Sequence, residues 1–150
     1  MRRSPEAWSI QQIVEHLLLT HESTAATFET RVQKGTPTQA SASLQQRAAQ
    51  FVVTTLGIFP KGRLAPERVM PPDPTVRPLS AIELNARIAE VLFPMDAAMT
   101  QAEQLFGLKK RSVSHAILGP MSVYQWRFFH FVHGEHHLRQ ILATRRVFQI

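Results

Sequence analysis

The stretch SVYQWRFFHFVHGEHHLRQI, residues 122–141, combines the pattern of a long amphipathic helix with four of the chain's seven histidines. Ser122 is followed three positions later by Gln125, which is the spacing of a capping box at the start of a helix. The apolar side chains that follow recur every three to four residues, as on one face of a helix. We therefore predict a helix from Ser122 to about residue 145.

Three histidines share one face of this predicted helix. At 100° per residue, His130, His133 and His137 point in the same direction, and His136 lies nearer the edge. Two histidines four residues apart have Cβ atoms roughly 5–6 Å apart, so their rings can converge on one metal ion. A metal-free core would need a hydrogen-bond partner for every buried ring. Because catalytic zinc sites use three protein ligands, this stretch alone leaves both a metal site and a histidine-rich core open.

The same start and stop signals mark three earlier helices. Each begins near a serine with glutamine or glutamate three residues later, and each ends before glycine or proline. We expect them over residues 8–33, 43–56 and 79–106. Pro94 lies inside the third helix and predicts a kink there.

The connection between the second and third helices is rich in proline. Residues 58–79 contain six prolines, more than a helix or a central strand tolerates. Strand signals are nearly absent elsewhere, and we expect His115 to anchor the loop before the last helix. The sequence therefore predicts an all-α four-helix bundle in one domain, residues 1–150, with a long Pro-rich crossover loop that lets the second and third helices run parallel.

Composition limits the classes of function. The chain has no cysteine, which excludes disulfides, thiolate metal sites and a catalytic thiol. The net charge of +6 and a pI of about 10.8 raise nucleic acid as a partner. However, the Lys/Arg clusters are short and no nucleic-acid-binding signature accompanies them, so we expect no nucleic-acid partner. No apolar run approaches the roughly 20 residues that span a bilayer, and we expect a cytoplasmic protein without membrane contact.

A third metal ligand would have to come from another helix. The first predicted helix contains VEHLLLTH, residues 14–21, which offers His16 and His21. On a helical wheel, His21 lies near the middle of the apolar face and His16 lies at its margin. The residues alone therefore favour His21 slightly.

Motifs at both ends of the chain carry a resemblance to a known family. WSIQQIVEHL at residues 8–17, the Pro-containing crossing, and HAILGPMSVYQWRFFHFVHGEHHLRQI at residues 115–141 together resemble the DinB/YfiT-like superfamily of metal-dependent enzymes. Members of that superfamily fold as four-helix bundles and commonly bind Zn or Ni. Their ligands are one histidine on the first helix and an HxxxH pair on the last.

This resemblance implies a ligand set in the present chain. The first-helix ligand falls on His16, in the setting E-H-L, and the pair falls on His133 and His137. The resemblance thus favours His16 over the wheel's choice of His21. His21 and His130 remain candidates to support or to replace a ligand. Gln140, one turn beyond the pair, could orient a ligand ring, although a solvent-facing role is nearly as consistent with its position.

Three neutral imidazoles would leave a coordination position open for water or a substrate. The resemblance implies a metal-dependent hydrolase or thiol transferase acting on a small molecule, with a low-molecular-weight thiol as one candidate. Any thiol must come from a cosubstrate, since the chain has no cysteine. No general base is evident. Glu15, Glu22 and Glu135 are expected to point away from the predicted ligands, and Glu90 or Asp96 would reach inward only if the kink at Pro94 directs them there.

The last helix is apolar on a second side as well. Phe128, Phe131, Leu138 and Leu142 lie away from the histidine face, and the superfamily resemblance adds an expectation of dimers. We therefore expect a homodimer. The alternative to an enzyme is a non-catalytic helical dimer, in which the histidines hold a structural metal or only hydrogen-bond one another.

Overall fold

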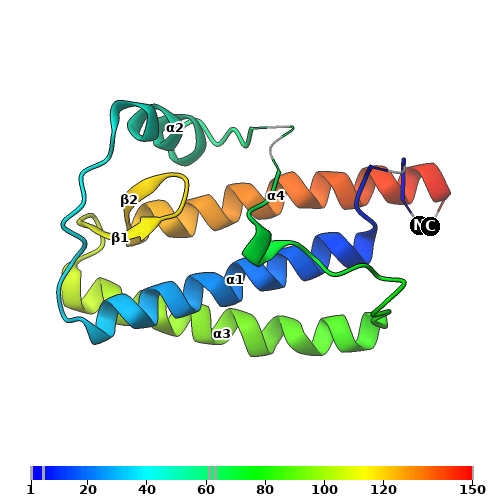
Figure 1. Ribbon diagram of the computed structural model, residues 1–150, viewed down its shortest axis with the longest axis horizontal. Helices are drawn as coiled ribbons and strands as arrows, with labels where there is room; N and C mark the ends of the chain where they lie inside the picture. Colours follow the sequence, from blue (N-terminus) through cyan, green and yellow to red (C-terminus); the bar gives the residue numbers. More distant parts are fainter. Residues whose placement is uncertain (1, 5, 61, 63, 150) are drawn as a thin grey trace.

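The computed structural model describes residues 2–4, 6–60, 62 and 64–149 of the chain. It is mostly helical, as predicted, with one small sheet (Figure 1). Its elements in chain order are α1 (Ile10–Gln33), α2 (Leu44–Thr54), the 3-10 helix η1 (Glu67–Val69), α3 (Ala81–Phe106), β1 (Arg111–His115), β2 (Gly119–Ser122) and α4 (Val123–Phe148).

All four α-helices begin at the predicted capping boxes. The serine side chain accepts a hydrogen bond from the backbone N–H three residues on, and the side chain at that position accepts one from the serine N–H. This reciprocal pair satisfies two backbone donors that a helix start leaves without partners. The four N-cap residues are Ser9, Ser43, Ser80 and Ser122. Local sequence signals therefore set where every α-helix begins.

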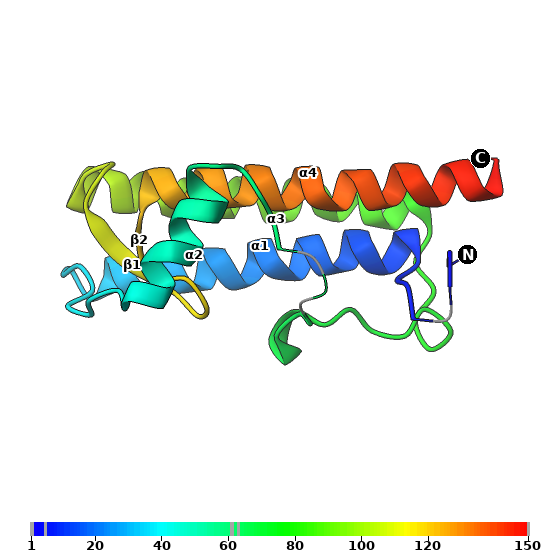
Figure 2. The same cartoon turned by 90° about the horizontal axis from the view of Figure 1, so that it is seen from above.

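Three long helices, α1, α3 and α4, lie side by side along the molecule (Figures 1 and 2). α1 and α3 run in the same direction, and α4 runs opposite to both. An ion pair of 2.9 Å between Glu22 and Arg87 joins α1 to α3, and a 3.1 Å hydrogen bond from Arg127 to Thr100 joins α4 to α3. None of the described helices combines the length and apolar character that crossing a bilayer requires.

The short helix α2 departs from the predicted bundle. It lies across one end of α4 and the sheet, instead of running alongside the long helices and parallel to α3 (Figure 2). The side chain of Gln50, 2% exposed, donates hydrogen bonds of 2.6 and 2.9 Å to the carbonyl oxygens of Leu118 and Pro120. These bonds hold α2 against the hairpin.

The hairpin β1–β2 corrects the prediction of an all-α fold. The strands pair antiparallel, with Val113 opposite Met121 and His115 opposite Gly119. They have five and four residues, and β2 contains proline, so neither has the length or composition of a recognisable strand. His115 Nδ1 accepts the N–H groups of residues 117 and 118, at 3.0 and 3.1 Å. The predicted loop-anchoring role of His115 is therefore confirmed.

One core joins the hairpin to all the long helices. The indole N–H of Trp126 donates to the carbonyl of Val113 at 3.1 Å, which fixes the start of α4 on β1. The fully buried side chains around this contact are Phe28, Met99, Ala102, Val113, Met121 and Val123. The hairpin thus fixes the start of α4 relative to α1. This position determines which residues of the two helices face each other.

We predict that Gln50→Ala destabilises the protein by about 2 kcal/mol, because two buried carbonyl groups lose their donor. Urea unfolding followed by circular dichroism measures the change. Gln45→Ala is the matched control, since Gln45 is exposed on the same helix and its loss should cost less than about 0.5 kcal/mol. Equal stability of the two variants would contradict the role given to Gln50.

Candidate metal centre

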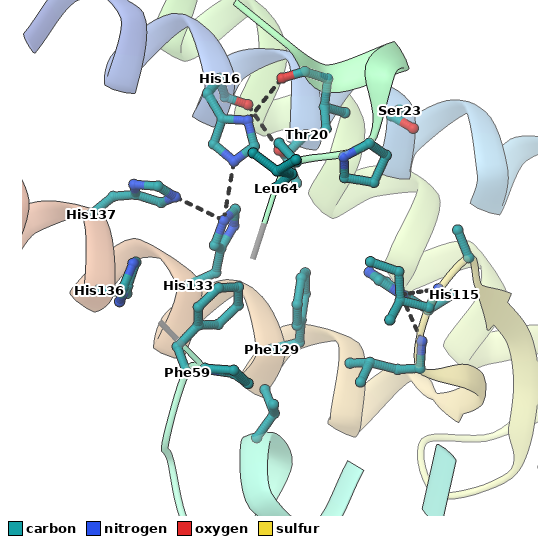
Figure 3. Close-up of a pocket in the computed structure, with 18 of the residues that line it drawn as sticks. His16, Thr20, Ser23, Phe59, Leu64, His115, Phe129, His133, His136 and His137 are labelled. Carbon is teal, nitrogen blue, oxygen red and sulfur yellow. Dashed lines mark hydrogen bonds between the residues drawn. The ribbon is translucent and has the colours of Figure 1, made fainter. Parts of the chain in front are cut away.

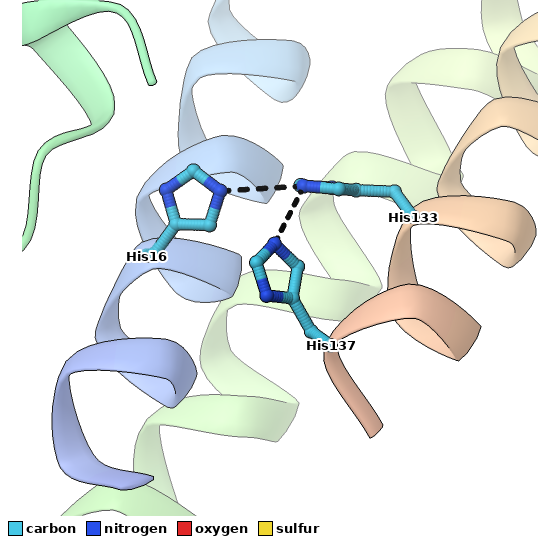
Figure 4. Close-up of side chains that lie close together, drawn as sticks. All are labelled: His16, His133 and His137. Atoms are coloured by element: carbon cyan, nitrogen blue, oxygen red, sulfur yellow. Dashed lines mark hydrogen bonds between the residues drawn. The ribbon is translucent and has the colours of Figure 1, made fainter. Parts of the chain in front are cut away.

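Two antiparallel helices bring three buried histidines together. His16 comes from α1, and His133 and His137 come from successive turns of α4 (Figure 4). Their residues are 4%, 4% and 5% exposed. The structure thus assembles the three residues that the resemblance implied as ligands, and it places them between α1 and α4.

The ring nitrogens converge at distances suited to one ion. His133 Nε2 lies 3.3 Å from His16 Nε2 and 3.0 Å from His137 Nε2. One nitrogen from each ring lies within 4.8 Å of the others. Because Zn–N bonds are about 2.0–2.1 Å long, two nitrogens on a tetrahedral zinc are roughly 3.3 Å apart. The two separations from His133 therefore match the spacing of nitrogens on one divalent metal ion, and the third pair lies within 4.8 Å.

Hydrogen bonds to the far side of two rings decide their tautomers. His16 Nδ1 lies 2.8 Å from the carbonyl oxygen of Val69, and His137 Nδ1 lies 2.8 Å from Gln140 Oε1. Both oxygens can only accept, so each ring carries its proton on Nδ1 and leaves a bare lone pair on Nε2. This is the arrangement that supporting hydrogen bonds impose on metal-ligating histidines. Of the two roles left open for Gln140, the structure thus favours contact with the ring of His137.

The three rings cannot satisfy one another by hydrogen bonding alone. A neutral imidazole carries one N–H, so His133 can donate to either His16 or His137 and not to both. In at least one of the two short contacts, the two nitrogens would therefore face each other with lone pairs, unless a cation lies between them. This geometry favours a metal site over the metal-free histidine core.

Aromatic rings hold the histidines in place. Phe59 and Phe129 stack on the His133 ring, with centroid separations of 4.9 and 5.4 Å. Trp8 packs on His16 at 4.8 Å and stacks on His137 at 6.2 Å. Such packing restricts rotation of the rings, so the nitrogens need little reorganisation to bind a ligand.

Burial keeps these imidazoles neutral. Burial, and then the neighbouring rings His137 and His16, lower the pKa of His133 to about 2. Burial also lowers the pKa of His137 to about 4, against the bond to Gln140, which raises it. The pKa of His16 is lowered by burial and raised by the bond to Val69. Since a metal binds the neutral ring, protons compete weakly for this site at neutral pH.

The three histidines line one end of a cavity of about 650 Å³ (Figure 3). Phe59 and Phe129 form its apolar wall, and His115 lies toward the opposite end. A ligand in the cavity would therefore reach the nitrogens directly. This access distinguishes the site from a closed structural metal site.

His21 and His130 form a separate pair beside the centre. Their ring centroids are 4.9 Å apart, and His130 Nε2 contacts the hydroxyl of Thr24 at 3.1 Å. Neither ring belongs to the group of three that converges. The slight preference of the helical wheel for His21 was therefore wrong. His21 lies five residues after His16 on α1. Because α1 and α4 are antiparallel, His21 lies opposite His130, which precedes the HxxxH pair on α4.

The acidic residues considered as general bases are engaged elsewhere or exposed. Glu22 pairs with Arg87, Asp96 with Arg127, and Glu135 with Arg139. Glu15 is buried and accepts a hydrogen bond from Gln11 at 3.4 Å, and Glu90 is exposed. None of these five lines the cavity, where Glu6 is the only carboxylate among the described residues.

Two parts of the site come from loops and were not predicted from the sequence. Val69, whose carbonyl binds His16, lies in the proline-rich connection, and Phe59 lies just after α2. Neither has a local signal for contact with a histidine, because their positions depend on the path of a 26-residue connection between α2 and α3.

Comparison with protein-family models, curated proteins and solved structures found no match to this chain.

We predict that Gln140→Leu weakens Zn²⁺ affinity about tenfold, because His137 loses the acceptor that fixes its tautomer. Competition with a chromophoric chelator at neutral pH measures the affinity. Gln104→Leu, at an exposed position of α3, is the control and should bind as the wild type does. Unchanged affinity in Gln140→Leu would show that the hydrogen bond does not support the ligand.

We predict that the metal-free protein loses stability as the pH falls from 7 to 5. Burial, followed by the charges of His21 and His115, lowers the pKa of His130 to about 3, whereas an unfolded histidine titrates near 6.5. Below about pH 6.5 the unfolded chain takes up this proton and the folded chain does not, so the stability present above that pH is lost on acidification.

The slope of this loss tests the contribution of His130. A ring that stays neutral in the folded protein costs about 2 kcal/mol of stability between pH 7 and pH 5. His130→Asn removes the titrating group and should reduce the loss by about that amount. Urea unfolding at several pH values, with chelator present, measures it. An identical pH dependence in variant and wild type would contradict the assignment.

Proposed function

We propose that this protein is a metal-dependent enzyme that binds a divalent ion through His16, His133 and His137 and acts on a small molecule in the adjoining cavity. The observation that carries the proposal is the convergence of three Nε2 atoms at the wall of that cavity. In His16 and His137 the ring proton lies on Nδ1, so Nε2 presents a lone pair. The resemblance of the sequence to the DinB/YfiT-like superfamily supports the same conclusion.

The donor set narrows the metal. Three imidazoles suit Zn, Ni and Cu, and they disfavour Mg and Ca, which prefer oxygen ligands. Together with the resemblance, this favours Zn or Ni. Three protein ligands leave at least one position for an external group, which is the pattern of catalytic sites. When bound, the ion would polarise a carbonyl group or lower the pKa of a water or thiol ligand.

The residues of the chain indicate what else the site supplies. His16, His133 and His137 would hold the ion, while Val69 and Gln140 keep two of the rings in the ligating tautomer. Phe59 and Phe129 present an apolar surface beside the open side of the site and limit access of water. Because Glu6 is the only carboxylate among the described cavity residues, a thiol that loses its proton on binding suits the site better than a reaction needing a general base.

Thiol transfer is thus the first proposed reaction and metal-dependent hydrolysis is the second. We also propose a homodimer, since Phe131, Leu138 and Leu142 on the outer side of α4 are 63%, 45% and 42% exposed. A non-catalytic protein with a structural metal is the alternative. Access from the cavity to all three histidines argues against that alternative.

Metal content tests the site. Untagged wild type and the double variant His133→Ala/His137→Ala are exposed to a mixture of Zn, Ni and Mn, desalted and analysed for each element. We predict about one equivalent of Zn or Ni in the wild type and little metal in the double variant. His21→Ala, which removes a histidine of α1 that lies outside the converging group, is the matched control and should load normally. Equally low metal in all three proteins would refute the site.

Activity then separates an enzyme from a structural metal protein. Wild type loaded with Zn or Ni should accelerate either addition of a small thiol to an electrophile or hydrolysis of an activated ester, and chelation should abolish the acceleration. A structural metal would instead leave both reactions at the background rate, while its removal lowers the melting temperature.

A further inference from the structure

A solvent-exposed arginine also lines the cavity. Arg68, in η1, lines the cavity and has no ion-pair partner among the described residues. Ser23 and Thr27 of α1 line the same cavity, and all three residues also line a neighbouring hollow of about 360 Å³. Arg68 and these hydroxyls therefore form a shared boundary between the two hollows, which we call the Arg68 end.

The position of Arg68 is coupled to the metal centre by the backbone. Arg68 directly precedes Val69, whose carbonyl oxygen accepts the Nδ1–H of His16 at 2.8 Å and whose side chain is buried. The bond that orients a candidate ligand thus also holds η1 over the cavity. The charge of Arg68 also acts on His115. Burial is the larger cause that lowers the pKa of His115 to about 4, and the positive charge of Arg68 lowers it further.

The cavity has a direction from the histidines to the Arg68 end. His16 lies at one end, and Ser23 and His115 lie toward the other (Figure 3). Seven residues of α1 separate His16 from Ser23, which corresponds to roughly 10 Å along the helix axis. Phe129 lies between His133 and His115 in Figure 3, and Phe59 stacks on His133. The cavity thus combines a site for a metal-binding group, an apolar middle and a cationic end.

The charges favour an anionic ligand. The charged side chains among the described cavity residues are Arg3, Arg68 and Glu6, which leave an excess of positive charge before any metal is bound. A divalent ion on three neutral imidazoles would increase that excess. The planar guanidinium group of arginine binds a carboxylate through two parallel hydrogen bonds. The hydroxyl of Thr27 donates to the carbonyl of Ser23 at 2.7 Å, so it has only lone pairs left to offer a ligand, whereas Arg68 supplies donors.

We infer that the ligand of this cavity is an extended organic carboxylate, with its carboxylate bound by Arg68 and its reactive group, about 10 Å away, at the three histidines. This inference rests on the proposed function and adds the chemical class of the substrate. It makes Arg68 a specificity-determining residue that has no contact with the metal ion.

Length-matched probes test the inference. Zn-loaded protein is titrated calorimetrically with 6-mercaptohexanoate and with 6-mercaptohexanol, which have the same chain length and end in a carboxylate and a neutral hydroxymethyl group. We expect the carboxylate to bind about tenfold more tightly, since a charge-assisted hydrogen bond is the larger of the polar contacts available. In Arg68→Gln the two probes should bind within about twofold of each other, and Arg68→Lys should restore part of the preference. Arg47 is exposed on α2 and lies outside the cavity. Arg47→Gln changes the net charge by the same amount and should keep the preference for the carboxylate.

The outcomes separate this inference from the proposed function. Equal binding of both probes to the wild type, or a preference that survives Arg68→Gln, would overturn the carboxylate site while leaving the metal centre intact. If the protein binds no metal, the proposed function fails. Hexanoate and hexanol are then titrated separately into the metal-free protein, and their affinities are compared. A preference for hexanoate that Arg68→Gln abolishes would uphold the carboxylate site by itself, and no preference would refute it.

Discussion

The candidate site depends on two hydrogen bonds that lie outside it. The carbonyl oxygen of Val69 and the amide oxygen of Gln140 each accept the Nδ1 proton of a histidine, and so they direct the lone pairs of His16 and His137 toward His133. With those two protons placed, His133 cannot satisfy both neighbours. A cation resolves this conflict better than any arrangement of neutral rings that keeps both of these hydrogen bonds.

The rest of the fold keeps those oxygens in position. Gln140 lies one turn beyond His137, so α4 alone provides it. Val69 must be delivered from the long connection between α2 and α3, where burial of its side chain holds the carbonyl over α1. The hairpin fixes the start of α4 through Trp126, and this contact sets the register between α1 and α4. Packing at one end of the molecule thereby determines which histidines meet near the other.

The surroundings of the site suit binding more than acid–base chemistry. The carboxylates of α1, α3 and α4 that sequence analysis considered are paired, exposed or turned away, and the cavity offers aromatic walls and two arginines. Burial holds the imidazoles neutral well below their ordinary pKa. A site of this composition can bind a metal and an anionic organic ligand together while contributing few protons of its own.

The sequence by itself determined the helix starts and the HxxxH pair, because each depends on residues within four positions of one another and on the 3.6-residue turn. It did not determine the β1–β2 hairpin or the crossing of α2, and it left the role of Gln140 open. The helical wheel favoured His21, whereas the resemblance implied His16. The hairpin strands are too short to show a period, and Gln50 reaches across 68 residues to bind Leu118. Only the tertiary structure, which sets the register of antiparallel α1 and α4 and brings Val69 to His16, decided which first-helix histidine faces the pair.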